Sequence, residues 1–148
     1  MGETLTFLPD LKLVHVRVDQ DLNLGVLRRL AFQAHLTVRQ LMSVDSRLIS
    51  LVDLGAARVI PEDDLVEQAV TLQDRLGEHY PFYRRAIVAQ DPALLAICRR
   101  FVELSRDRAV TSQVFNALPS ALEWLELDPE LAHSAPFNGQ PREDSPCT

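Results

Sequence analysis

The sequence has few of the residues that most directly mark a function. It contains two cysteines, Cys98 and Cys147, which are too few and too widely separated for a disulfide framework or a cysteine metal site. Glycine occurs only five times, and no glycine-rich phosphate loop is present. Unpaired cysteines are typical of a reducing compartment, so we expect a cytoplasmic protein without disulfide bonds.

Long apolar runs and strong basic charge are also missing. No run approaches the roughly 20 apolar residues of a membrane span, and the first residues lack the basic and apolar regions of a signal peptide. Lysine and arginine number 15 against 21 aspartates and glutamates, which gives a net charge of −6. Because phosphate contacts dominate binding to nucleic acids, we expect no nucleic-acid partner for this acidic chain. The lack of a long apolar run leads us to expect no membrane span.

Catalytic and metal-binding motifs are missing as well. The four histidines have no ligand spacing such as His-x-x-x-His, and the sequence has no Gly-x-Ser-x-Gly or Cys-x-x-Cys segment. We therefore predict no catalytic residue, no metal site and no cofactor. His15 is predicted to point outward from an edge strand.

Strand and helix patterns alternate along most of the chain. Residues 4–8 and 11–18 resemble a hairpin around the turn at Pro9 and Asp10. The sequence predicts further strands at 48–54, 84–90 and 110–115, and helices at 23–35, 61–76, 92–108 and 119–127. The segment 36–46 either continues the first helix or forms a second turn.

This order, β-β-α-β-α-β-α-β-α, predicts an α/β fold with a mixed, mostly parallel sheet and the N-terminal hairpin at its edge. The helical and extended patterns end near Leu127, so we expect one domain over residues 1–127. Residues 128–148 contain four prolines and little apolar surface. We expect them to form a Pro-rich, disordered tail.

Three short segments carry a resemblance to a known family. They are Leu51-Val52-Asp53-Leu54, the stretch Arg85-Ala86-Ile87-Val88-Ala89-Gln90-Asp91-Pro92, and Val114-Phe115 followed by Ala121-Leu122-Glu123-Trp124-Leu125. Together with the order of elements, they resemble the SpoIIAA-like proteins, bacterial members of the STAS-type fold, over about residues 5–127.

The resemblance implies a non-enzymatic binding or regulatory domain. Related folds include anti-sigma factor antagonists and the CRAL-TRIO lipid-binding proteins. The antagonists carry a phosphorylatable serine at a helix start, but residues 55–62 here are Gly-Ala-Ala-Arg-Val-Ile-Pro-Glu and offer no hydroxyl. The leading hypothesis is therefore a module that acts through contacts with a protein partner or with itself. The alternative is a carrier of a small, lipid-like apolar ligand, which needs a cavity of ~300 Å³ or more.

Candidate binding residues follow from the sheet, because ligands of open α/β sheets favour the carboxyl ends of parallel strands. Asp53, Asp91 and Asn116 follow or end three predicted strands, and Arg58 lies close to Asp53 in sequence. Asp53 has two possible roles. It could be a carboxylate that binds a ligand or acts as a general base, or it could be a structural group bonded to loop backbone or to an arginine such as Arg58. We favour the structural role. Trp124 in the last helix is predicted to be mostly buried and structural.

Overall fold

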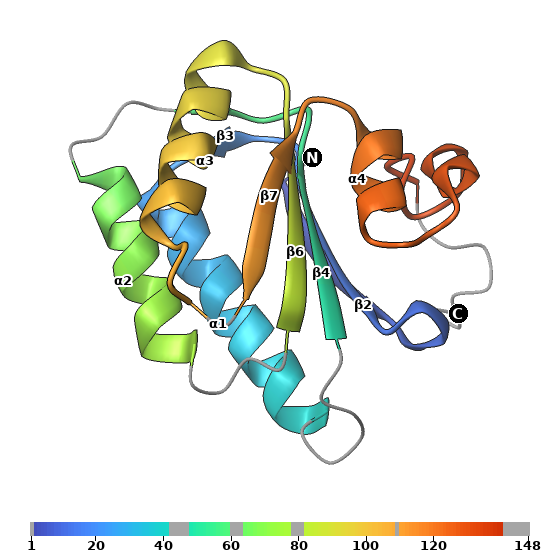
Figure 1. The fold of residues 1–148 in the computed structure, drawn as a ribbon, viewed down its shortest axis with the longest axis horizontal. Coiled ribbons are helices and arrows are strands. Elements are labelled where there is room, and N and C mark those ends of the chain that lie inside the picture. The colour runs from blue at the N-terminus through green and yellow to red at the C-terminus, as the bar shows by residue number, and fades with distance from the viewer. Residues whose placement is uncertain (1, 42–47, 60–63, 78–81, 109, 141–148) are drawn as a thin grey trace.

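The computed structural model describes residues 2–41, 48–59, 64–77, 82–108 and 110–140. A central sheet separates two layers (Figure 1). Three helices lie on one face of this sheet, and a short helix with the C-terminal segment lies on the other.

The sheet has five strands in the order β1-β2-β4-β6-β7. Their bounds are Glu3–Leu8 for β1, Leu13–Val18 for β2, Leu48–Leu54 for β4, Phe82–Ala89 for β6 and Thr111–Phe115 for β7. β1 and β2 pair antiparallel, and all later pairs are parallel. The predicted mixed sheet with an N-terminal hairpin is thus confirmed. A separate parallel pair is formed by β3 (Asp21–Leu22) and β5 (Arg58–Val59).

Four α-helices and two 3-10 helices complete the described chain. They are α1 (Leu24–Leu41), α2 (Leu65–Gly77), α3 (Pro92–Leu104), α4 (Leu118–Trp124), η1 (Pro9–Leu11) and η2 (Pro129–His133). The first part of the ambiguous segment 36–46 therefore continues α1 to Leu41, and residues 42–47 lie outside the described residues. The predicted helix start at Pro61 also lies outside them, and α2 is observed from Leu65.

Helix ends follow local side-chain chemistry. Asp91 caps α3, because its carboxylate accepts a hydrogen bond of 3.1 Å from the Leu94 N–H, and Pro92 occupies the first turn. Residue 117 at the start of α4 is an alanine and makes no side-chain cap. Trp124 ends that helix partly buried, with its ring 5.8 Å from the Phe115 ring.

Each face of the sheet buries its own apolar core. On β2, Val14, Val16 and Val18 face the core under α1–α3, whereas Leu13 faces the opposite core with α4. Strands buried on both faces require nearly continuous apolar runs, which explains the sequence of β4.

The expectation of a disordered tail is wrong for residues 128–140. Phe137 is only 2% exposed, and it joins the core formed by Leu13, Leu122 and Leu125. The seven-residue α4 is too short to cover its face of the sheet, and the segment after it supplies the missing apolar contacts. The prolines were taken as a sign of disorder, but Pro129 begins the 3-10 helix η2. Residues 141–148 lie outside the described residues.

The prediction for His15 is also wrong. β1 occupies the edge, so β2 is an inner strand and His15 is 1% exposed. Its ring lies 5.1 Å from that of Phe137. Burial lowers the pKa of His15 to about 4, and the nearby positive charge of Arg17 acts in the same direction.

Candidate functional site

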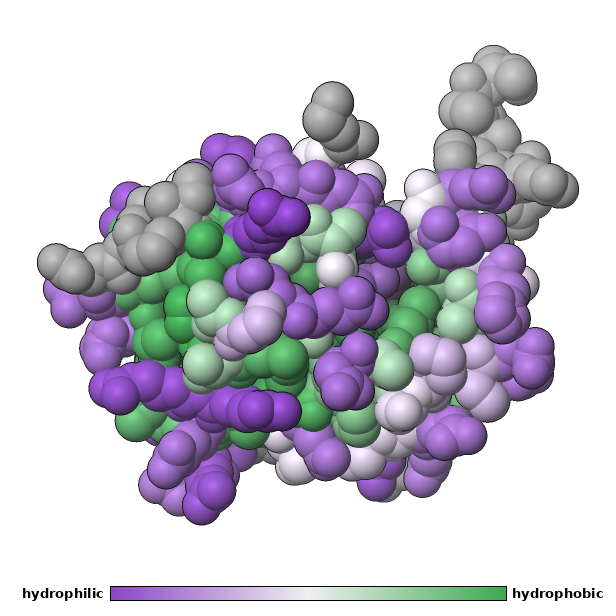
Figure 2. All heavy atoms as spheres, turned by 90° about the horizontal axis from the view of Figure 1, so that it is seen from above, coloured by the Kyte–Doolittle hydropathy of each residue, from purple (hydrophilic) through white to green (hydrophobic). Residues whose placement is uncertain are grey.

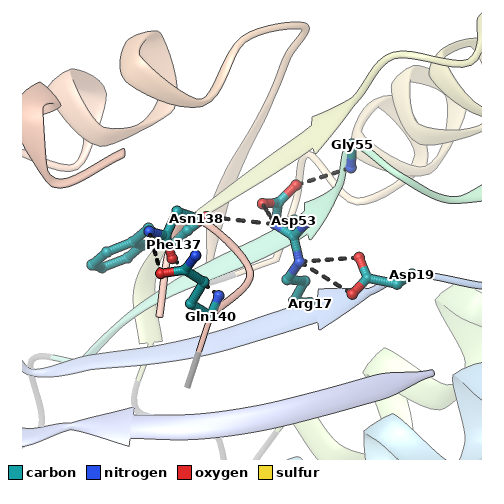
Figure 3. Close-up of polar contacts among 7 residues, drawn as sticks. All are labelled: Arg17, Asp19, Asp53, Gly55, Phe137, Asn138 and Gln140. Carbon is teal, nitrogen blue, oxygen red and sulfur yellow. Dashed lines mark hydrogen bonds and ion pairs between the residues drawn. The ribbon is translucent and has the colours of Figure 1, made fainter. Parts of the chain in front are cut away.

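Asp53 forms an ion-paired cluster at the carboxyl ends of β2 and β4 (Figure 3). The strand register pairs Arg17 with Asp53, which places their side chains on the same face of the sheet. Arg17 Nη1 lies 3.1 Å from Asp53 Oδ2, and Arg17 Nε lies 3.0 Å from Asp19 Oδ1. One arginine therefore bridges two carboxylates.

The Asp53 carboxylate is buried and already engaged at both oxygens. The residue is 4% exposed, and the Gly55 N–H donates a 2.9 Å hydrogen bond to Oδ1. Desolvation raises the pKa of Asp53, while the Gly55 N–H and the Arg17 charge act against that rise. With Oδ2 held by Arg17, the geometry matches a structural carboxylate.

The C-terminal segment covers this cluster. Arg17 Nη1 donates a 3.4 Å hydrogen bond to the Phe137 carbonyl. Gly139 lies directly against the guanidinium, with φ at +87°; a Cβ there would sit 3.0 Å from Arg17 Nη2. Beyond it, the Gln140 N–H donates to Asn138 Oδ1 over 3.0 Å, which closes the turn seen in Figure 3. The cluster therefore anchors residues 137–140 to the sheet.

The other predicted site residues do not gather around Asp53. Its arginine partner is Arg17, so the suggested pairing with Arg58 is wrong; Arg58 is exposed on β5. Asp91 is used as the cap of α3, and Asn116 is exposed after β7. Among the described residues, no hydrogen bond or ion pair joins Arg58, Asp91 or Asn116 to Asp53.

A pocket of about 210 Å³ lies on the opposite face of the sheet, under α1, α2 and α3. Its wall is mainly aliphatic and includes Val16, Leu30, Val52, Leu72, Ile87 and Ile97. Seen from above, hydrophobic residues are visible between hydrophilic ones on the side of the molecule where α2 lies (Figure 2).

Three polar residues also line this pocket: Ser50, Gln73 and Arg85. Gln73 is buried; its Nε2 donates to Ser105 Oγ over 2.9 Å, and its Oε1 accepts from Arg85 Nη1 over 2.7 Å. The Arg85 guanidinium lies 5.9 Å from the centre of the Phe101 ring. A hydrogen-bonded polar group thus borders an otherwise apolar space.

Cys98 lines the same pocket as a neutral thiol. Burial raises the pKa of Cys98 to about 12, so the thiolate required for nucleophilic attack is not populated near neutral pH. Its role there is that of a small apolar side chain.

Ser50, Gln73 and Arg85 are not among the site residues predicted from the sequence. The available signal was a serine inside β4 and an arginine inside β6, two strands that are mainly apolar. Only the strand register shows that the two positions are neighbours.

The layers, the strand order and the antiparallel first pair define a SpoIIAA-like fold. The structure is similar to that of an uncharacterized protein of the DUF3478 family from Shewanella loihica PV-4, itself described as having a SpoIIAA-like fold. The TM-score is 0.56 at 14% sequence identity, over 84% of this chain and 94% of that one. No family model matches the sequence, and no curated protein matches it.

Within the described ranges, no group of three or more His, Cys, Asp or Glu side chains is placed to hold a metal ion. No helix in the described part of the chain has the length and apolar character needed to cross a membrane.

Proposed function

We propose that the protein is a non-enzymatic binding module that holds a small apolar molecule between its sheet and α1–α3. The observation that carries this proposal is the pocket of about 210 Å³. Concave, mainly apolar pockets with a few polar groups on the wall are the usual form of small-molecule sites.

The size of the pocket limits the ligand. An apolar cavity of about 150 Å³ in another protein holds benzene, so by that scale 210 Å³ accommodates about eight carbon atoms. A membrane lipid needs more than ~300 Å³. The proposed ligand is accordingly a small molecule with a short apolar chain or ring.

A non-enzymatic role is supported by the state of the two most reactive-looking groups. Asp53 is held by Arg17 and the Gly55 N–H on the face opposite the pocket, and the thiol of Cys98 is neutral. A buried reduced cysteine also agrees with the proposed cytoplasmic location.

Contacts between proteins are the second candidate function, and one observation favours them. Phe32 and Leu36 are 62% and 43% exposed one turn apart on α1, and so form an apolar strip. Self-association through this strip would make the oligomeric state depend on Phe32. Light scattering of the native protein and a Phe32→Ser variant separates this function from ligand binding.

Native mass spectrometry and thermal unfolding with 1-octanol test the proposed pocket. We expect a 1:1 adduct and a higher melting temperature, because a ligand that binds only the folded state stabilises it. Ala69→Leu adds three carbons to the pocket wall and should abolish both effects. Ala96→Leu makes the same change on the exposed face of α3 and should leave them intact. If the native protein shows no adduct and no stabilisation, the pocket is not a binding site.

A further inference from the structure

Residues 128–140, here called the strap, lie against the face of the sheet opposite the pocket, beside α4 (Figure 1). Among the described residues, the backbone hydrogen bonds of the strap are internal to it. Examples are the 3.0 Å bonds from the Ser134 N–H to the Leu131 carbonyl and from the Asn138 N–H to the Ser134 carbonyl. The strap therefore forms its own turns and adds no strand to the sheet.

The end of the strap is attached to two residues of β2. The Phe137 ring lies 5.1 Å from the His15 ring, and the Phe137 carbonyl accepts a hydrogen bond of 3.4 Å from Arg17 Nη1 (Figure 3). Within the described part of the chain, this is the single hydrogen bond between the strap and the sheet, and it is a long one. Leu131 and Ala132 add partly buried apolar contacts. Packing of Phe137 on His15 is thus the main attachment of the strap end.

The His15 ring fits beneath the strap only in its neutral form. Its Nε2 is buried and has no hydrogen-bond partner. A protonated imidazole carries an N–H on both nitrogens, so protonation would leave a buried donor without an acceptor. Burial and the charge of Arg17 both lower the pKa of His15, to about 4.

No acidic group compensates a proton on His15 while the strap is attached. The sheet neighbours of His15 are Thr6 on β1 and Leu51 on β4, and neither is titratable. Among the described residues, no carboxylate forms an ion pair with His15, and Arg17 is itself bound to Asp19 and Asp53. On β6, Arg84 is bonded to the Trp124 carbonyl. The titratable residues of α4, of η2 and of the turn between them are all exposed: Glu123, Glu126, Asp128, Glu130 and His133.

We propose that residues 128–140 form an acid-released strap, in which protonation of His15 detaches Phe137 and uncovers His15 and Arg17 while the sheet and α1–α3 stay folded. Once Phe137 has left, water can reach the imidazolium. The released form exposes the carboxyl end of β2, a position at which α/β sheets commonly bind ligands. The device is independent of the pocket, which lies on the other face.

The size of the expected effect follows from proton linkage. We define the opening constant as the ratio of released to attached strap. If the pKa of His15 is 6.5 in the released form and about 4 in the attached form, the opening constant is ~30-fold larger at pH 5 than at pH 7.5.

Hydrogen–deuterium exchange of the full chain at pH 7.5 and pH 5, corrected for the intrinsic exchange rate at each pH, measures this constant. Exchange in the strap should accelerate ~30-fold on acidification. At pH 5 the strap should also exchange at least ~100-fold faster than β4, because local opening costs less than global unfolding. Equal protection of the strap and β4 at pH 5 would show that the strap opens only with the whole domain, and would overturn the proposal.

His15→Leu should abolish the acceleration, because leucine cannot be protonated. His133→Leu makes the same change on the exposed end of η2 and should leave the acceleration intact. If His15→Leu does not fold, His15→Gln provides a second uncharged variant with the same expected result.

These variants also separate His15 from Asp53, the other buried titratable group of this face. Burial raises the pKa of Asp53, so acid also acts on the carboxylate that holds Arg17. Acceleration that persists in the His15 variants would assign the release to Asp53 and overturn the proposal. The absence of any acceleration in the native protein would overturn it as well. Acceleration that is lost with His15 and kept in His133→Leu would support it.

Discussion

Replacing Phe137 with alanine should lower the free energy of unfolding by about 3–5 kcal/mol, as is typical for large aromatic residues in a core. Phe137 is 2% exposed and packs with Leu13 and Leu122, so the truncation leaves a cavity that the neighbouring side chains fill only in part. Urea unfolding followed by the fluorescence of Trp124, the only tryptophan of the chain, measures this loss.

Phe32→Ala is the matched control, because the same atoms are removed from a side chain that is 62% exposed. It should change the free energy of unfolding by less than ~0.5 kcal/mol. If both variants behave alike, Phe137 is not packed in solution and the expectation of a disordered C-terminal tail is restored.

Acid should destabilise the protein through His15. Its pKa is about 4 in the folded protein against 6.5 as its ordinary value, so between these two values the unfolded state binds more protons than the folded state. The stability that neutral His15 confers is therefore complete above pH 6.5 and is lost as the pH falls toward 4. The difference of about 2.5 pKa units corresponds to about 3 kcal/mol.

His15→Leu should remove this dependence. Leucine cannot be protonated, and His15 Nε2 is buried without a hydrogen-bond partner, so the substitution should change stability at pH 7.5 by less than ~1 kcal/mol. Urea unfolding of both proteins from pH 7.5 to 4 measures the difference between their free energies of unfolding. Groups that titrate in both proteins contribute equally to the two values and cancel in this difference. A constant difference across this range would show that His15 does not become buried in the neutral form.

The sequence predicted the elements that carry strong periodic patterns. The apolar run of β4 and the Asp91-Pro92 start of α3 are local signals, and the structure confirms both. The N-terminal hairpin followed from the turn at Pro9 and Asp10, which the structure shows as η1. Local chemistry was sufficient in each case because the determining residues are adjacent in sequence.

Tertiary packing overrode the local pattern at the C-terminal segment. Prolines and a low apolar content are typical of disorder, but a single phenylalanine, Phe137, can secure a short segment when a sheet face nearby is left uncovered. The burial of His15 has the same origin, because the segment that covers it follows it by more than 100 residues. No local signal contains that information.

The candidate binding site depends on register, which the sequence does not display. Ser50 and Arg85 belong to two strands and become neighbours only when those strands are aligned. Asp53 was found because it ends an apolar strand, yet its partner Arg17 is 36 residues away and was not anticipated. Pairings of this kind follow from strand order and cannot be inferred from spacing along the chain.

A crystal structure of the protein grown with 7-bromo-1-heptanol, in which bromine replaces the terminal methyl group of 1-octanol, shows directly whether the pocket under α1–α3 is a binding site. We expect one anomalous bromine peak inside the pocket, among Leu30, Leu72 and Ile97. A well-ordered structure in which the pocket holds no ligand, or in which bromine is found only at the molecular surface, would show that it is not a binding site.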